Sequence, residues 1–173
     1  MRVVGVDPGS VVAGFGVVDG TAQHPVLVAA GTIRVASLKR GPARLNGIYR
    51  RLIEVIDHYR PQAMSLERSF VAVNAQSAFR LGEARAVAML AAAERNLEFF
   101  EYTPAEVKMA VASHGRADKG QVKAMVRRAL GLDAGFALED DSADALALAV
   151  CHLIRARFDA AARGESAPAC GRD

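Results

Sequence analysis

Hydrophobic and polar positions follow two patterns along this chain, one typical of strands and the other typical of helices. Short apolar runs rich in β-branched or aromatic residues predict five strands, at 3–6, 14–18, 26–35, 63–67 and 97–102. Longer stretches with apolar residues three and four positions apart predict helices at 42–59, 74–96, 104–111, 119–130 and 140–158. The first three strands, joined by turns, are expected to form an antiparallel meander. The α-β-α-β-α order that follows predicts one α/β domain, in which a five-stranded mixed sheet is flanked by helices.

Length and composition suit a single globular domain. The chain has 173 residues, of which 51% are hydrophobic and 24% charged, and this is enough to bury a core. We expect the folded domain to cover residues 1–158. Residues 159–173 are dominated by small, polar and charged side chains, which predicts a disordered tail.

The net charge, the lack of long apolar runs and the cysteines indicate which partners and which cellular compartment to expect. A net charge of +3 is compatible with a polyanionic partner. The apolar runs are all shorter than the ~20 residues of a membrane-spanning helix, and the first residues show no signal-peptide pattern. Cys151 lies in an expected helix and Cys170 in the expected tail, so a structural disulfide is not expected. Together these features predict a cytoplasmic protein with no membrane association.

Acidic residues occur at the ends of apolar elements. Asp7 and Glu67 each end a hydrophobic strand, and Asp141 and Asp144 share one face of the first turn of the last helix. If the two strands are neighbours and the helix crosses them, the four acids converge. Converging carboxylates raise one another's pKa unless a cation lies between them. Oxygen ligands of this kind suit Mg²⁺ or Mn²⁺, and two such ions could stabilise the attacking and leaving oxygens of a phosphodiester.

Each acid also has a purely structural interpretation. Asp7 could cap the turn at Pro8-Gly9, and Glu67 could pair with Arg68. Asp140 or Asp141 could cap the last helix, and an acid in its first turn would meet the helix dipole favourably. Spacing alone does not choose between these interpretations and a catalytic site.

Five motifs together resemble those of the RuvC family of Holliday-junction resolvases. They are GVDPGS at 5–10, LERSF at 66–70, NAQSA at 74–78, LGEAR at 81–85 and DSADALA at 141–147. Their order and spacing match the family from the amino terminus to about residue 152. The resemblance implies a ribonuclease H-like fold, and it places the four acidic positions of the family on Asp7, Glu67, Asp141 and Asp144.

The same resemblance implies an activity and its partners. The expected enzyme is a homodimeric crossover junction endodeoxyribonuclease that resolves four-way DNA junctions by paired, symmetric nicks. It would use two Mg²⁺ ions per active site, with Mn²⁺ able to substitute, and would leave 5′-phosphate and 3′-hydroxyl ends. It would act in DNA recombination and repair together with the RuvA–RuvB branch-migration complex.

Basic and aromatic residues are candidates for DNA contact. Lys108 and Lys119 match family positions that meet the DNA backbone beside the active site, and Arg116 could extend this positive strip. Phe70 matches a family aromatic that stacks on exposed bases at the junction centre. The structural alternatives are solvated lysines and a Phe70 that belongs to the core.

The helix expected at 74–96 is apolar on two sides, so two partners must cover it. One face carries Phe79, Gly82, Ala86, Leu90, Ala93 and Leu97, and the other carries Ala78, Leu81, Ala88, Met89 and Ala92. We expect the sheet to cover one face and a partner subunit to cover the other, with the second face as the subunit contact. Another helix of the same chain is the alternative cover.

Two other functions compete with a resolvase. The motif at 7–10 resembles the first phosphate loop of actin-like ATPases and sugar kinases, but these proteins need two related lobes and the chain has room for one. A junction-binding module without cleavage is the non-enzymatic alternative, and the four intact acids argue against it.

Overall fold

A computed structural model describes residues 1–9, 12–35, 41–68, 74–133 and 135–162, with side chains described as far as residue 159. The strands form one five-stranded sheet in the order β3-β2-β1-β4-β5, in which β1, β2 and β3 are antiparallel neighbours and β1, β4 and β5 are parallel neighbours. The strands are β1 (Val3–Asp7), β2 (Val12–Gly20), β3 (Pro25–Arg34), β4 (Ala63–Glu67) and β5 (Glu98–Tyr102). The predicted α/β fold with a mixed sheet is therefore confirmed.

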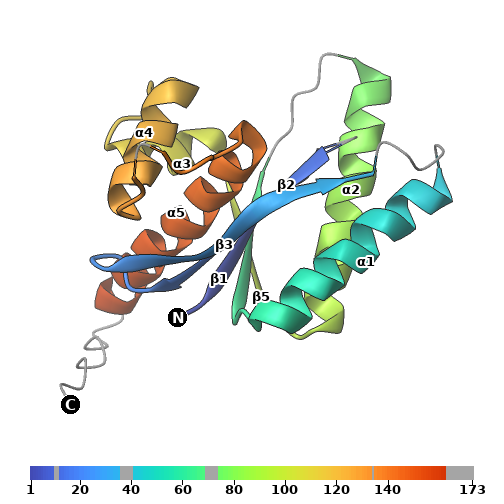
Figure 1. Ribbon diagram of the computed structural model, residues 1–173, viewed down its shortest axis with the longest axis horizontal. Helices are drawn as coiled ribbons and strands as arrows, with labels where there is room; N and C mark the ends of the chain where they lie inside the picture. The colour runs from blue at the N-terminus through green and yellow to red at the C-terminus, as the bar shows by residue number, and fades with distance from the viewer. Residues whose placement is uncertain (10–11, 36–40, 69–73, 134, 163–173) are drawn as a thin grey trace.

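Five helices accompany the sheet in the part of the chain that is described (Figure 1). They are α1 (Pro42–Tyr59), α2 (Ala75–Glu94), α3 (Pro104–Ala112), α4 (Lys119–Ala129) and α5 (Asp140–Ala162). Capping boxes at Thr103 and Asp118 begin α3 and α4, and the Asn74 side chain accepts a hydrogen bond at the start of α2. Helix α5 continues to Ala162, beyond the predicted end of the domain at residue 158. None of the helices described is long and apolar enough to cross a membrane.

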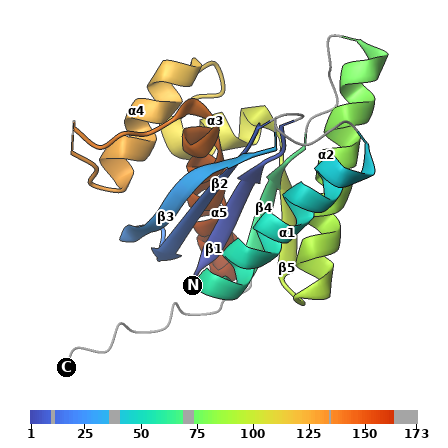
Figure 2. The same cartoon turned by 45° about the vertical axis from the view of Figure 1, so that its right-hand side comes forward.

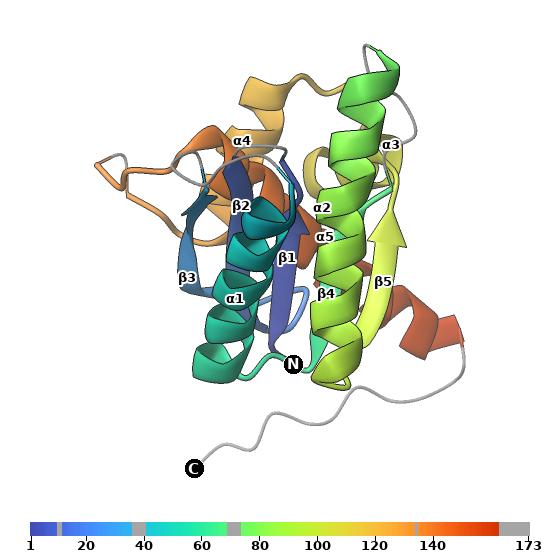
Figure 3. The ribbon, with the colours of Figure 1, turned by 90° about the vertical axis from the view of Figure 1, so that its right-hand side faces the viewer.

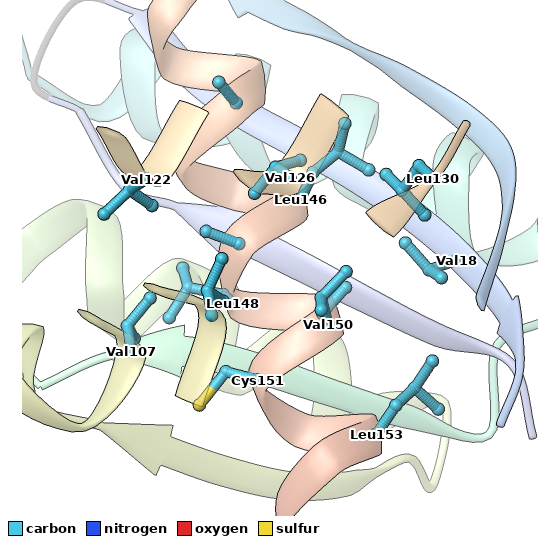
Figure 4. Packing of buried hydrophobic residues seen from close by; sticks show 14 of the residues in the cluster. Val18, Val107, Val122, Val126, Leu130, Leu146, Leu148, Val150, Cys151 and Leu153 are labelled. Carbon is cyan, nitrogen blue, oxygen red and sulfur yellow. The ribbon is translucent and has the colours of Figure 1, made fainter. Parts of the chain in front are cut away.

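The helices cover the two faces of the sheet in separate groups. Helices α1 and α2 lie against one face, and α5, with α3 and α4 outside it, lies against the other (Figures 2 and 3). Alternate strand residues feed the two cores because successive side chains point to opposite faces. Val4 and Val6 of β1 pack with α1 and α2, whereas Val3 packs with α5. Figure 4 shows the second core, in which α5 residues such as Leu146 and Leu148 meet α3 and α4.

Glycines allow α5 to approach the sheet very closely. A Cβ atom built on Gly5 would lie 1.9 Å from the Ala145 carbonyl oxygen, and one built on Gly14 would lie 1.9 Å from the Asp141 carbonyl oxygen. The backbone of α5 therefore rests directly on β1 and β2, where any larger residue would force the helix away. This contact fixes where the first two turns of α5 lie over the sheet.

Helix α2 packs on its own chain through part of the face expected to meet a partner. Ala88 and Ala92 are buried beside α1 and the sheet, and this corrects the expectation that their face is the subunit contact. The opposite apolar face is the uncovered one: the side chains of Phe79 and Leu90 are 75% and 59% exposed. The exposed stripe consists of Phe79, Gly82, Ala86, Leu90 and Ala93.

Candidate active site

Two strand ends place Asp7 and Glu67 side by side. Strands β1 and β4 are parallel neighbours with Val6 opposite Leu66, so the acid that follows each residue lies at the same carboxyl edge of the sheet. Val6 and Leu66 point into the core beneath α1 and α2. By alternation, Asp7 and Glu67 point to the other face, toward α5.

The first turns of α5 bring two more acids to this edge. Gly14 is paired with Asp7 in the β1–β2 ladder, and the main chain of Asp141 rests on Gly14. Asp144 lies one turn further along the helix and lines a groove with Glu67. The close approach of α5 to the glycines is thus what carries its acids to the strand ends.

The electrostatics of Asp7 record this convergence. Burial and the nearby carboxylates of Asp144, Glu67 and Asp141, in that order, raise the pKa of Asp7 to about 7, although Lys119 partly offsets them. One acidic cluster is therefore formed by the ends of β1 and β4, which are 60 residues apart in the sequence, and by the start of α5, the last helix of the chain. The structure brings together all four acids that the sequence singled out.

Asp140, the neighbour of Asp141, faces elsewhere. Its carboxylate is 2.7 Å from Lys123 Nζ, and this hydrogen bond lowers the pKa of Asp140. Its side chain is 83% exposed, and it is not among the charges that raise the pKa of Asp7. Of the two adjacent acids, Asp141 is the one directed toward the cluster.

Two lysines border the acids. Lys119 Nζ lies 3.0 Å from Asp144 Oδ2, and this hydrogen bond raises the pKa of Lys119. A groove of about 280 Å³ is lined by Lys108, Lys119, Glu67 and Asp144, with apolar walls from α3, α4 and α5. A negatively charged ligand that enters this groove would meet both ammonium groups beside the carboxylates.

The two remaining candidates are not placed in the groove. Arg116 is exposed in the connection between α3 and α4 and is absent from the described residues that line the groove. Phe70 lies outside the described residues.

The donor set fits hard divalent cations. Four carboxylates supply only oxygen ligands, the kind that Mg²⁺ prefers. Burial and the neighbouring carboxylates raise the pKa of Asp7, and a bound cation would stabilise its ionised form. Within the described ranges, no three His, Cys, Asp or Glu side chains are already arranged as a metal cage. The Lys119 ammonium is hydrogen-bonded to Asp144 and lies near Asp7 and Glu67, so it acts as the cation of the cluster in this arrangement.

The residues that position the acids are not among the residues predicted to form the site. Gly5 and Gly14 could have been noticed, because glycine inside an apolar strand often marks the close approach of another backbone. Arg85 belongs to the motif at 81–85, and in the structure its guanidinium donates to the main-chain carbonyl of Glu67. The sequence pattern carries no signal for that contact, because its acceptor is backbone.

A mixed sheet of this order, crossed by a helix that carries acids to the ends of β1 and β4, defines a ribonuclease H-like domain with a cluster of acids at the carboxyl ends of these strands. The family model described as crossover junction endodeoxyribonuclease RuvC matches residues 3–152. The chain belongs to this family, as the motifs indicated, and it is therefore an endonuclease of DNA recombination and repair.

Known relatives are similar to this chain in sequence and in structure over about nine tenths of its length. The crossover junction endodeoxyribonuclease RuvC of Magnetococcus marinus is 45% identical over 153 residues, which cover 88% of this chain and 84% of the relative. The structure of T. thermophilus RuvC in complex with Holliday junction substrate superposes with a TM-score of 0.86 at 34% identity, covering 92% and 96% of the two chains. The yeast mitochondrial Holliday junction resolvase shares the fold, with a TM-score of 0.64 at 15% identity over 91% and 80% of the chains.

Proposed function

We propose that the chain resolves four-way Holliday junctions by paired nicks, with Asp7, Glu67, Asp141 and Asp144 holding two Mg²⁺ ions at each active site. The observation that carries this proposal is the convergence of four carboxylates at one edge of the sheet, where burial and the three other acids raise the pKa of Asp7. The substrate class is supported by the T. thermophilus relative, whose structure contains a Holliday junction substrate.

The position of Asp7 suits it to share both cations. Glu67 lies on the neighbouring strand, whereas Asp141 and Asp144 come from the helix above, so Asp7 stands between two groups of oxygen donors. Bound there, Mg²⁺ or Mn²⁺ would polarise the phosphate and lower the pKa of the attacking water, giving 5′-phosphate and 3′-hydroxyl ends. The carboxylates would hold these ions, and the close contact between α5 and the strands would keep the carboxylates in fixed positions.

The groove beside the acids suits the DNA backbone. Lys108 and Lys119 line it together with Glu67 and Asp144, so a phosphate positioned for cleavage would lie between ammonium groups and bound cations. We assign Arg116 to the flanking backbone as an extension of the positive strip of Lys108 and Lys119. On the basis of the family resemblance, we assign Phe70 to stacking on bases at the junction centre.

A homodimer is the proposed assembly, and the exposed stripe on α2 is its contact. Phe79 and Leu90 expose large apolar surfaces on an otherwise packed helix, which supports coverage by a second copy. A two-fold dimer would present two equivalent sites to a junction whose strands are also related by approximate two-fold symmetry.

The assembly can be tested with two charge substitutions on opposite faces of α2. Leu90→Glu should yield folded monomers in sedimentation equilibrium and uncouple the two nicks, since Leu90 is exposed in the subunit. Ala88→Glu should instead unfold the chain, because it buries a charge against α1 and the sheet. A Leu90→Glu protein that remains dimeric would exclude this face as the contact.

The activity is tested with a synthetic four-way junction and a linear duplex of the same arms. We expect Mg²⁺-dependent, symmetric nicks in the junction and none in the duplex, with chelation by EDTA abolishing cleavage. Junction binding without nicking would instead favour a binding module. RuvA–RuvB should accelerate resolution if the proposed partnership holds.

The kinase alternative finds no support in the architecture. Actin-like ATPases and sugar kinases bind nucleotide between two related lobes, whereas the described residues form one five-stranded sheet with its helices.

A further inference from the structure

Arg85 of α2 connects two strands from the face of the sheet opposite to the acids. Its Nη1 donates to the main-chain carbonyl oxygen of Glu67, and its Nη2 pairs with the carboxylate of Glu101 on β5. The Arg85 and Glu101 side chains are only 17% and 26% exposed, so water screens this ion pair less than a surface pair.

The contacted carbonyl lies where the strand pairing ends. The β1–β4 ladder runs to the pair of Val6 with Leu66, and the β4–β5 ladder runs to the pair of Glu67 with Tyr102. The next amide, that of Arg68, donates to the Tyr102 carbonyl at 2.7 Å. Arg85 therefore holds the last residue of β4, at the point where the regular ladders stop restraining the chain.

Arg85 and the carboxylate of Glu67 lie on opposite faces of the sheet. Tyr102 faces α5, where its hydroxyl lies 2.8 Å from His152 Nδ1, so the preceding Glu101 faces α2 by alternation. The Glu67 side chain lies in the groove on the α5 face. Arg85 thus grips the backbone of Glu67 from one face of the sheet, while the carboxylate of Glu67 projects from the other.

We propose that Arg85 is a positioning residue for the nuclease reaction, which fixes the main chain of Glu67 and thereby the direction of its carboxylate. This inference rests on the proposed role of Glu67 as a metal ligand. The guanidinium is required because it donates to two acceptors on two strands at once, which a lysine ammonium at the same place cannot do with the same geometry. Helix α2 also carries the exposed apolar stripe, so the hydrogen bond from Arg85 to Glu67 connects the helix of the proposed dimer contact with the acidic cluster.

The first test measures Mn²⁺ affinity by titration calorimetry on the full chain without DNA. Arg85→Lys should weaken binding about 10-fold, the lower end of what loss of a residue that orients a ligand costs. In a Glu67→Gln background the same change should have no further effect, because the residue through which Arg85 acts is already lost. Glu101→Gln, which leaves the guanidinium without its carboxylate, should weaken binding in the same direction.

Arg95→Lys is the matched control. Arg95, the residue that follows α2, also pairs with a carboxylate, that of Asp57 on α1. It lies near the end of the sheet where β4 begins, at the opposite end of that strand from Glu67, so its substitution should leave Mn²⁺ affinity unchanged. Equal losses in the wild-type and Glu67→Gln backgrounds would overturn the positioning role, and so would wild-type affinity in both Arg85→Lys and Glu101→Gln.

Hydrogen exchange supplies a readout that does not depend on metal. Without the guanidinium, the Arg68 amide should exchange faster in Arg85→Lys than in Arg95→Lys, while amides in the centre of β1 stay protected. Unchanged exchange at Arg68 would overturn the proposed support of the strand end. If Glu67→Gln alone leaves Mn²⁺ affinity intact, the assignment of Glu67 as a metal ligand is wrong. If Glu67→Gln weakens Mn²⁺ binding and Arg85→Lys binds Mn²⁺ with wild-type affinity, only the role of Arg85 is rejected.

Discussion

The two faces of the sheet are covered by helices in different ways. On the α1 and α2 face, large side chains such as Ile48, Leu52 and Met64 keep helices and strands apart. On the α5 face, Gly5 and Gly14 let the helix backbone touch the strand backbone. Side-chain packing tolerates small shifts, whereas direct backbone contact fixes one position. The close contact occurs where α5 places its acids beside those of β1 and β4. The contact that allows the least movement therefore lies where the positions of the acids matter most for the proposed chemistry.

The largest expected effect comes from removing a carboxylate from the α5 face. Asp7→Asn and Glu67→Gln should each lower the nicking rate by about 10²–10³-fold or more, the scale for loss of one group that stabilises transition-state charge. Both changes keep side-chain shape, so junction affinity measured by gel shift should change little. A folded variant that has lost junction binding would show that these acids are structural.

The second prediction concerns pH in the absence of metal. Asp7 has a pKa of about 7 in the folded chain, against an ordinary value of 3.8, so between these pH values the native state binds the additional proton. The free energy of unfolding in EDTA should therefore fall as pH rises from 4 to 7, by up to a few kcal/mol. Asp7→Asn should remove this slope and be more stable than the wild type at pH 8.

The control for that prediction is magnesium. Added Mg²⁺ should restore stability to the wild type at pH 8 and have a much smaller effect on Asp7→Asn. Parallel pH profiles for the two proteins in EDTA would show that the ionised carboxyl of Asp7 is not destabilised by burial and by the neighbouring carboxylates.

The third prediction tests the backbone contact itself. Gly14→Ala should lower the free energy of unfolding by about 1–3 kcal/mol, as overpacking does, because its Cβ meets the Asp141 carbonyl. It should also slow nicking, since α5 must shift. Gly135→Ala is the matched control, as a Cβ there has nothing within 4 Å. Denaturant unfolding with normal stability for Gly14→Ala would contradict the close approach.

The sequence predicted the strands, the helices and the four acids because each leaves a local pattern. Short apolar runs mark β1 and β4, and an acid at the end of each run stands out. The face of α2 was assigned wrongly, since both sides are apolar and only the packed structure shows that Ala88 is buried and Leu90 is not. The support of Glu67 by Arg85 was missed because a bond to a backbone carbonyl has no sequence signature.

The smallest expected effect separates two adjacent acids at the start of α5. Asp140→Asn should change the nicking rate by less than about twofold, because its carboxylate is exposed and paired with Lys123, and exposed pairs contribute little. Asp141→Asn should cost at least about 10-fold, since Asp141 is among the charges that act on Asp7. Single-turnover rates on a saturating junction, with Lys123→Met as a check on the ion pair, compare the two directly. Asp140 and Asp141 are adjacent on the helix, so their side chains point in different directions. Equal losses of nicking rate in the two variants would mean that α5 presents a different face to the strand ends. Both the contact between Gly14 and Asp141 and the assignment of Asp141 as a ligand would then be wrong.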